Sequence, residues 1–154
     1  MQQPKIIAQA SADIMPLYQH FGFRDWLEEP SIEETAALLA TARDVVAACD
    51  GRQMIVSCGQ SESLVRVICQ FWDQRPPLSN ELWQGVQDFR LACPSGEVFI
   101  DQPTMLAVDL SRYHKLEPGV VNVRMMWRGR RDPRESVAPN QLGSVTEIYN
   151  LQLW

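Results

Sequence analysis

The residues best suited to acid–base or metal chemistry are two histidines and three aspartates, and their spacing predicts no active site. His20 and His114 lie far apart in the chain, and neither has a second ligand at a spacing typical of a metal site. Asp88, Asp101 and Asp109 end or interrupt predicted strands and could converge on a metal. Antiparallel strands place such residues at either end of a sheet, so the spacing in the sequence does not decide whether the three aspartates come together.

Signatures of nucleophilic catalysis and of phosphate binding are also missing from the sequence. The segment "GQSES" (59–63) lacks the G-x-S-x-G pattern of a nucleophile elbow. No glycine-rich phosphate loop follows a predicted strand. We therefore predict a protein that is not an enzyme and that uses no cofactor and no metal.

Cysteine usage and the apolar runs indicate the compartment. Cys49, Cys58, Cys69 and Cys93 form no C-x-x-C pair and fall within apolar segments, which favours reduced thiols packed as small hydrophobic side chains over disulfides. The segment "MQQPKIIAQASADIMP" (1–16) has no apolar stretch of signal-peptide length, and no run approaches the roughly 20 apolar residues that cross a bilayer. We expect a cytoplasmic protein with no membrane contact.

A group of arginines in "RGRRDPRE" (128–135) suggests a phosphate or nucleic-acid contact, or else a solvated hairpin loop. The group contains Arg128, Arg130, Arg131 and Arg134, with Asp132 and Glu135 among them. We favour the loop, because the chain has a formal net charge of −5 and no aromatic residue separates the arginines. We expect no direct contact with nucleic acid, and the role of the Arg128–Arg134 loop stays open.

The segment "DWLEEPSIEE" (25–34) concentrates negative charge around one tryptophan. Residues 1–50 hold three basic and eight acidic residues, so the whole excess of negative charge lies there. Carboxylates in a first helical turn complement the helix dipole, which accounts for two of the acids but not for those that precede the helix. An exposed aromatic side chain among carboxylates is typical of an anchor for a basic protein partner. The candidate partner-binding residues are Asp25, Trp26, Glu28, Glu29, Glu33 and Glu34.

One helix is predicted near this segment, over about 31–49. Ser31 and Glu34 match a capping box, and Pro30 stops any structure that runs in from upstream. Leu38, Leu39, Ala42, Val45, Val46 and Cys49 then recur at helical spacing and give one apolar face. "DG" at 50–51 ends the pattern.

The rest of the chain alternates with a period of two, which predicts strands. The expected strands are 16–24, 53–58, 64–72, 86–93, 97–101, 104–110, 120–127 and 145–154. With 154 residues, 45% of them hydrophobic, the chain fits one domain. We predict a mainly β protein, a single antiparallel β-sandwich of about seven to eight strands over residues 1–154, with the helix as a connection or a cover over one end.

The order of the segments "DGRQMIVSC", "SLVRVICQF", "PSGEVFI", "LAVDL", "EPGVVNVRMMWRG" and "EIYNLQLW" resembles a group of uncharacterised bacterial β-sandwich proteins. More distantly, it is similar to the competence protein J family, whose known member inhibits a DNA-entry nuclease. The resemblance covers residues 15–154 and rests on strand patterns and turns, so no contact residue of that family can be matched here. It implies an acidic cytoplasmic protein that blocks a nuclease or another toxin.

Two classes of function follow from these observations. The first is a non-catalytic inhibitor or immunity protein that neutralises a cognate bacterial toxin, such as a nuclease, by protein–protein contact through residues 25–34, with Trp83 and Trp154 as further candidates. The alternative is a small-ligand-binding or accessory β-sandwich module. The identity of the partner, the oligomeric state and the existence of a ligand pocket stay open at this stage.

Overall fold

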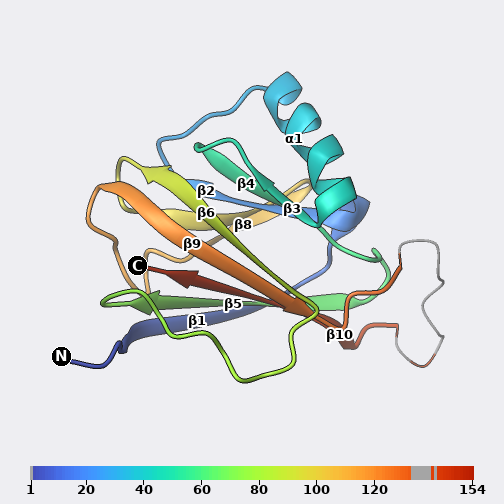
Figure 1. Cartoon of the computed structure of the whole chain (residues 1–154). Coiled ribbons are helices and arrows are strands. Elements are labelled where there is room, and N and C mark those ends of the chain that lie inside the picture. Colours follow the sequence, from blue (N-terminus) through green and yellow to red (C-terminus); the bar gives the residue numbers. More distant parts are fainter. Residues whose placement is uncertain (1, 133–139, 141) are drawn as a thin grey trace.

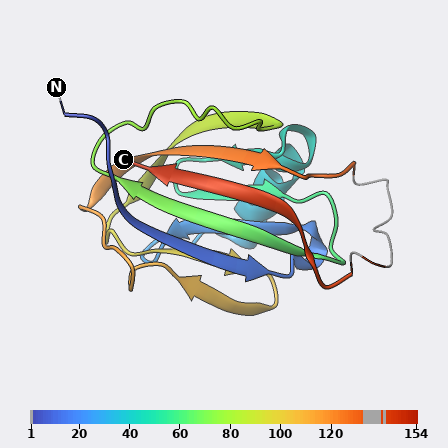
Figure 2. The same cartoon turned by 90° about the horizontal axis from the view of Figure 1, so that it is seen from below.

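Two β-sheets packed face to face form the body of the protein (Figures 1 and 2). The computed structural model describes residues 2–132, 140 and 142–154. Within these residues the chain forms ten strands, one α-helix and one short 3-10 turn. The predicted fold class, a mainly β sandwich with one helix in the N-terminal half, is confirmed.

Sheet A has the strand order β1-β5-β10-β9-β6. Its strands are β1 (Ile6–Ile14), β5 (Leu64–Trp72), β10 (Val145–Leu153), β9 (Gly119–Arg128) and β6 (Gly85–Cys93). Neighbouring strands are antiparallel except β5 and β10, which run parallel. The last strand of the chain therefore enters the middle of the sheet, between β5 and β9 (Figure 2).

Sheet B has the order β3-β4-β2-β7-β8, and all its neighbours are antiparallel. Its strands are β3 (Ala47–Cys49), β4 (Gln53–Ser57), β2 (His20–Asp25), β7 (Val98–Gln102) and β8 (Met105–Asp109). The 3-10 turn η1 (Leu17–Gln19) leads from β1 in sheet A to β2 in sheet B.

The core lies between the two sheets, where the period of two in the sequence places every second side chain. In β5, Val65, Val67, Cys69 and Phe71 are buried, while the residues that alternate with them are half-buried on the outer face. Tyr149 of β10 meets Phe21 of β2 across the gap, with ring centroids 5.4 Å apart in an edge-to-face arrangement.

The helix α1 (Ile32–Val45) begins where the sequence predicts. Ser31 is the N-cap, and its hydroxyl accepts a hydrogen bond from the backbone N–H of Glu34 at 3.0 Å. The Glu34 carboxylate accepts one from the backbone N–H of Ser31 at 3.3 Å, so both halves of the capping box are present.

The predicted end of the helix at Cys49 is wrong. The helix stops at Val45, Val46 has a positive φ of 79°, and Ala47–Cys49 form β3. Apolar residues at helical spacing continue through this point, but the tight connection from Cys49 to Gln53 pairs residues 47–49 with β4. Tertiary pairing thus overrides the helical pattern over the last predicted turn.

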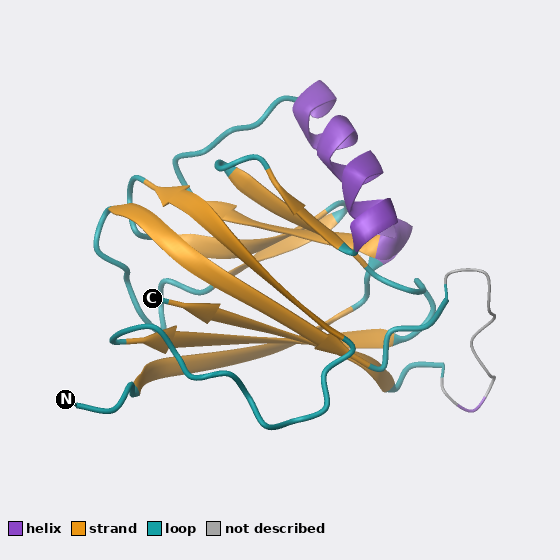
Figure 3. Cartoon of the chain, in the orientation of Figure 1, coloured by secondary structure: helices purple, strands orange, loops and turns teal. Residues whose placement is uncertain are grey.

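The helix connects β2 to β3, which is the first of its two predicted roles. It packs on the outer face of sheet B, over β3 and β4 (Figure 3), and not over an end of the sandwich. Leu38 and Ala42 of the helix meet Ala48 of β3 and Ile55 of β4 in a second, smaller core. No helix in the described part of the chain is long and apolar enough to span a membrane.

The strand β1 is absent from the sequence-based prediction. Its inward positions are mostly alanines, such as Ala8, Ala10 and Ala12, so the alternation between apolar and polar residues is weak. The strand forms because β5 offers a partner along nearly its whole length, from Ile6 opposite Trp72 to Ile14 opposite Val65.

Candidate functional site

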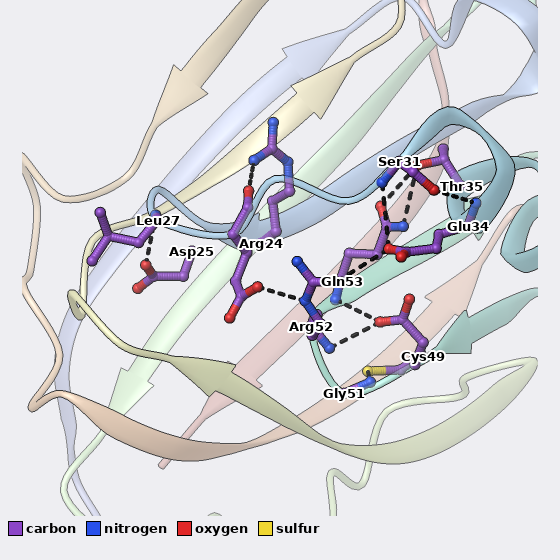
Figure 4. Close-up of polar contacts among 12 residues, drawn as sticks. Arg24, Asp25, Leu27, Ser31, Glu34, Thr35, Cys49, Gly51, Arg52 and Gln53 are labelled. Atoms are coloured by element: carbon purple, nitrogen blue, oxygen red, sulfur yellow. Dashed lines mark hydrogen bonds and ion pairs between the residues drawn. The ribbon is translucent and has the colours of Figure 1, made fainter.

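The predicted partner-binding residues run from Asp25, the last residue of β2, through the connection to the first turn of α1, which contains Glu33 and Glu34. We call residues 25–34 the acidic segment; Figure 4 shows Asp25, Leu27, Ser31 and Glu34 from it. Arg24 anchors the start of this connection from the end of β2. Its guanidinium donates to the carbonyl oxygen of Glu28, lies 3.4 Å from a carboxylate oxygen of Asp101 and sits 4.5 Å from the centroid of the Phe99 ring. These contacts fix the segment against β7 before it enters the helix.

Asp25 is buried and does not belong to the exposed surface. Its carboxylate accepts hydrogen bonds from the hydroxyl of Ser95 at 2.8 Å and from the backbone N–H groups of Leu27 at 2.9 Å and Gly96 at 2.9 Å. The side chain therefore joins the end of β2 to the turn between β6 and β7. This placement corrects the expectation that Asp25 faces a partner.

Glu28 and Glu34 share one arginine, Arg52, from the connection between β3 and β4 (Figure 4). The Nε atom of Arg52 lies 2.7 Å from the carboxylate of Glu28, and its Nη1 atom lies 3.2 Å from that of Glu34. The two carboxylates raise the pKa of Arg52. Both predicted residues are thus partly neutralised within the chain, by an arginine that the sequence analysis did not associate with them.

The remaining predicted residues are exposed. Trp26 keeps 63% of its surface exposed while one edge of its ring packs on Phe99, with centroids 5.5 Å apart. Glu29 and Glu33 are exposed, and within the described residues neither has a hydrogen bond or an ion pair from its side chain.

Two apolar side chains that the sequence analysis did not single out share this segment with the exposed residues. Leu27 is 62% exposed and Ile32 is 85% exposed. We call the set of Trp26, Leu27, Glu29, Ile32 and Glu33 the tryptophan patch.

A hollow of about 220 Å³ lies beside Trp26 on the outer face of sheet B. Phe99 contributes to its wall, and Glu97 and Asp109 add two carboxylates from β7 and β8 and their flanks. Hydrogen bonds from the hydroxyl and the backbone N–H of Ser111 lower the pKa of Asp109 and keep it ionised. The sequence analysis did not place these two acids beside Trp26, because they lie more than 60 residues beyond it.

The residues suited to catalysis do not come together as a catalytic group. The His20 Nδ1 atom lies 3.1 Å from the carbonyl oxygen of Tyr18, and the ring of His114 packs against Phe71. His20 and Asp101 line one hollow of about 230 Å³ beside Gly22, but Asp101 is paired with Arg24.

The three aspartates are also separated. Asp88 lies on sheet A and bonds Arg124, whereas Asp101 and Asp109 lie on sheet B. Among the residues that the structure describes, no group of three or more His, Cys, Asp or Glu side chains could hold a metal ion.

Arg128 and Arg130 of the arginine group are committed to contacts within the chain. Arg128 pairs with Glu81 at 3.0 Å and lies over the ring of Trp83, with 5.0 Å to the centroid. The Nε atom of Arg130 donates to the carbonyl oxygen of Ser57 at 3.0 Å. Arg134 and Glu135 lie outside the described residues.

All four cysteines are free thiols, as the sequence predicts. Cys58, Cys69 and Cys93 are buried in the main core, and Cys49 is half-buried beside it. Burial raises the pKa of Cys69 and raises that of Cys93 to about 12, so both stay protonated and unreactive at neutral pH.

The fold is that of a small two-sheet protein in which the exposed tryptophan patch lies around the start of α1. The chain is distantly similar to the competence protein J family. It matches the crystal structure of ComJ from Bacillus subtilis, an inhibitor of the DNA-degrading activity of NucA, with a TM-score of 0.62 and 9% identity over 97% of each chain. The predicted resemblance to this family is thereby confirmed.

A second solved structure matches over the full length. The protein of crocagin biosynthetic gene J aligns with a TM-score of 0.57 and 14% identity over 98% of each chain. At such identities the likeness concerns the fold. No known protein-family profile matches the sequence, and no curated protein matches it.

Proposed function

We propose that this protein is a non-catalytic inhibitor that neutralises a bacterial nuclease or a similar toxin by direct contact through the tryptophan patch. The observation that carries the proposal is the full-length likeness to ComJ, which covers 97% of both chains. An inhibitor role is consistent with the separate structural contacts of the two histidines and of Asp88, Asp101 and Asp109.

The chemistry of the patch supports the same proposal. Aromatic and apolar side chains supply most of the affinity at protein interfaces, and Trp26, Leu27 and Ile32 all stand exposed on one short connection. Glu29 and Glu33 surround them with charge that no basic residue neutralises within the described chain. A surface that binds DNA is basic, so an acidic rim would attract the nuclease that takes that substrate.

The inhibitor acts in the cytoplasm in this proposal, where its four thiols stay reduced. The partner then meets it either before export or after entry into the cell.

An inhibition assay tests the proposal. The protein is titrated into DNA-cleavage reactions of NucA and of the nuclease or toxin encoded nearest to its own gene. We expect cleavage by one of them to fall to zero near an equimolar ratio, with a complex of the two proteins on size-exclusion chromatography. Unchanged cleavage of DNA in both reactions at a large excess of the protein, with no complex formed, would contradict it.

A further inference from the structure

A third hollow, of about 430 Å³, lies on the outer face of sheet A, on the other sheet from the tryptophan patch. Its position is set by the antiparallel pairing of β6 with β9, in which Asp88 lies opposite Arg124 and Arg90 opposite Asn122. We call it the arginine pocket. The residues that line it are Arg75, Asp88, Phe89, Arg90, Asn122 and Trp154.

A buried arginine holds this region in place. Arg124 is 2% exposed, and its Nε atom lies 2.9 Å from a carboxylate oxygen of Asp88. Its Nη1 atom donates to the carbonyl oxygen of Pro76 at 3.2 Å, which ties the connection between β5 and β6 to the sheet. The Arg124 guanidinium also lies over the indole of Trp154, with 5.4 Å to the centroid. The Asp88 carboxylate and the Trp154 ring are therefore fixed before any ligand arrives.

The charge of the pocket is opposite to that of the protein. Arg75 and Arg90 line the pocket together with the carboxylate of Asp88, which Arg124 already pairs, whereas the whole chain has a net charge of −5. Arg75 is mostly exposed and reaches Asp88 only at 3.9 Å. The side chain of Arg90 is exposed and has no hydrogen bond or ion pair within residues 2–132, 140 and 142–154. The guanidinium groups of Arg75 and Arg90 are thus available to bind an anion.

We propose that the arginine pocket binds a small molecule in which a phosphate is attached to a flat ring, as in a nucleoside monophosphate. Two guanidinium groups are donors suited to phosphate oxygens. The amide nitrogen of Asn122 donates to the carbonyl oxygen of Trp154 at 3.4 Å and has a second N–H for the ligand. The indole of Trp154 offers a surface on which a ring can stack, and Asp88 offers an acceptor for ring N–H groups.

The size of the pocket favours a single small molecule over a polymer. A volume of about 430 Å³ falls in the range of small-ligand sites. A nucleic-acid strand would need a basic track that continues beyond the pocket, and the outer face of sheet A instead continues with Gln9, Gln70 and Gln152, which bond one another.

Calorimetric titration at low ionic strength tests the proposal, with AMP, adenosine, inorganic phosphate and a short single-stranded oligonucleotide as the probes. We expect AMP to bind at one site, and adenosine and phosphate each to bind at least about tenfold more weakly, because each makes only half of the contacts. The double variant Arg75→Gln/Arg90→Gln should weaken AMP binding about tenfold or more. Trp154→Leu should weaken AMP but leave the weak binding of phosphate unchanged.

The matched control is Arg43→Gln/Arg112→Gln, which removes the same charge from exposed positions on α1 and on the connection after β8. It should leave the affinity for AMP within about twofold, because screened charges far from the site act weakly. Circular dichroism checks that every variant is folded.

Three results would overturn the proposal: no saturable binding of AMP at millimolar concentration, equal binding of phosphate and AMP, or tighter binding of the oligonucleotide. None of these measurements involves a protein partner, so their outcome is independent of the inhibitor proposal.

Discussion

Burial and pairing decide which carboxylates of the acidic segment can meet another protein. The buried carboxylate of Asp25 accepts hydrogen bonds from the turn at Ser95 and Gly96, and Glu28 and Glu34 form ion pairs with Arg52. Only Glu29 and Glu33 stand exposed beside Trp26 without such partners in the described chain. Six residues with the same apparent role in the sequence therefore divide into a structural group and a surface group.

Asp25 provides the first prediction at this scale. Asp25→Ala should lower the free energy of unfolding by about 3 kcal/mol, because it leaves the buried N–H of Gly96 and the hydroxyl of Ser95 without their acceptor. Urea denaturation followed by tryptophan fluorescence measures the change. Asp25→Asn keeps one acceptor oxygen and should lose less, while Glu29→Ala should stay within about 0.5 kcal/mol of the wild type. Equal free energies of unfolding for the wild type and Asp25→Ala would contradict the claim that the Asp25 carboxylate stabilises the fold.

The protonation of Glu147 provides the second prediction at this scale, which concerns the pH dependence of stability. It is fully buried in β10, where its carboxylate accepts hydrogen bonds from the backbone N–H of Gly59 at 3.1 Å and from the hydroxyl of Tyr149. Cys58 and Arg130 lie beside the same network. Burial raises the pKa of Glu147 above its ordinary value, although the hydrogen bonds and Arg130 oppose the shift.

The sign of the effect on stability follows from this shift. Since the pKa of Glu147 is higher in the folded state, the protonated carboxyl group favours folding. This contribution to the free energy of unfolding is fully present below the unfolded pKa of about 4.3. It is lost as the pH rises through the folded pKa. The unfolding free energy of the wild type relative to Glu147→Gln should therefore fall as pH rises from about 4 towards neutrality. Urea titrations of both proteins across this range measure it. A difference that grows with pH would mean that the folded pKa is lowered.

The exposure and the local contacts of some residues in the acidic segment could be predicted from the sequence, whereas the contacts of others could not. The exposure of Trp26 follows from its acidic neighbours, and the capping pair of Ser31 and Glu34 is a local signal. The burial of Asp25 depends on the turn at Ser95, and the neutralisation of Glu28 depends on Arg52. Such contacts join residues distant in the sequence, and a single sequence carries no signal for them.

At the scale of elements, the strands with strong alternation were predictable and those that depend on a partner were not. The strands β5 and β6 alternate clearly, and both were predicted. The strands β1 and β3 form because β5 and β4 pair with them, although β1 faces the core mostly with alanine and β3 continues a helical pattern. The parallel pairing of β5 with β10 likewise follows from the route of the whole chain and from no local motif.

The start of α1 provides a prediction at this scale. Ser31→Ala removes the hydroxyl that accepts from the N–H of Glu34 and should lower the free energy of unfolding by about 1 kcal/mol. Urea denaturation measures the loss. The matched control Thr41→Ala changes an exposed hydroxyl within the helix and should have a smaller effect, because alanine also raises helix propensity there. A larger loss for the control than for Ser31→Ala would show that the cap does not stabilise the helix.

At the scale of the whole molecule, the two sheets expose two surfaces of different character. The segment beside sheet B is acidic with protruding apolar side chains, whereas the outer face of sheet A contains a cationic pocket beside Trp154. The sequence analysis singled out Trp26, Glu29 and Glu33 of the first surface because they lie close together in the chain. It could not predict the second, which assembles Arg75, Arg90 and Trp154 from three parts of the chain.

The central claim, inhibition through the tryptophan patch, is tested most directly by the charge-reversed variant Trp26→Ala/Glu29→Lys/Glu33→Lys. Glu62→Lys/Glu117→Lys serves as the control, because it makes the same reversal at two exposed acids outside the patch. The measurement is the concentration of each protein that halves DNA cleavage by the nuclease that the wild type inhibits. We expect this concentration to rise at least about 100-fold for the patch variant, since an aromatic anchor and two rim charges are lost together, and to stay near the wild-type value for the control. Equal inhibition by the patch variant and the wild type would contradict the claim.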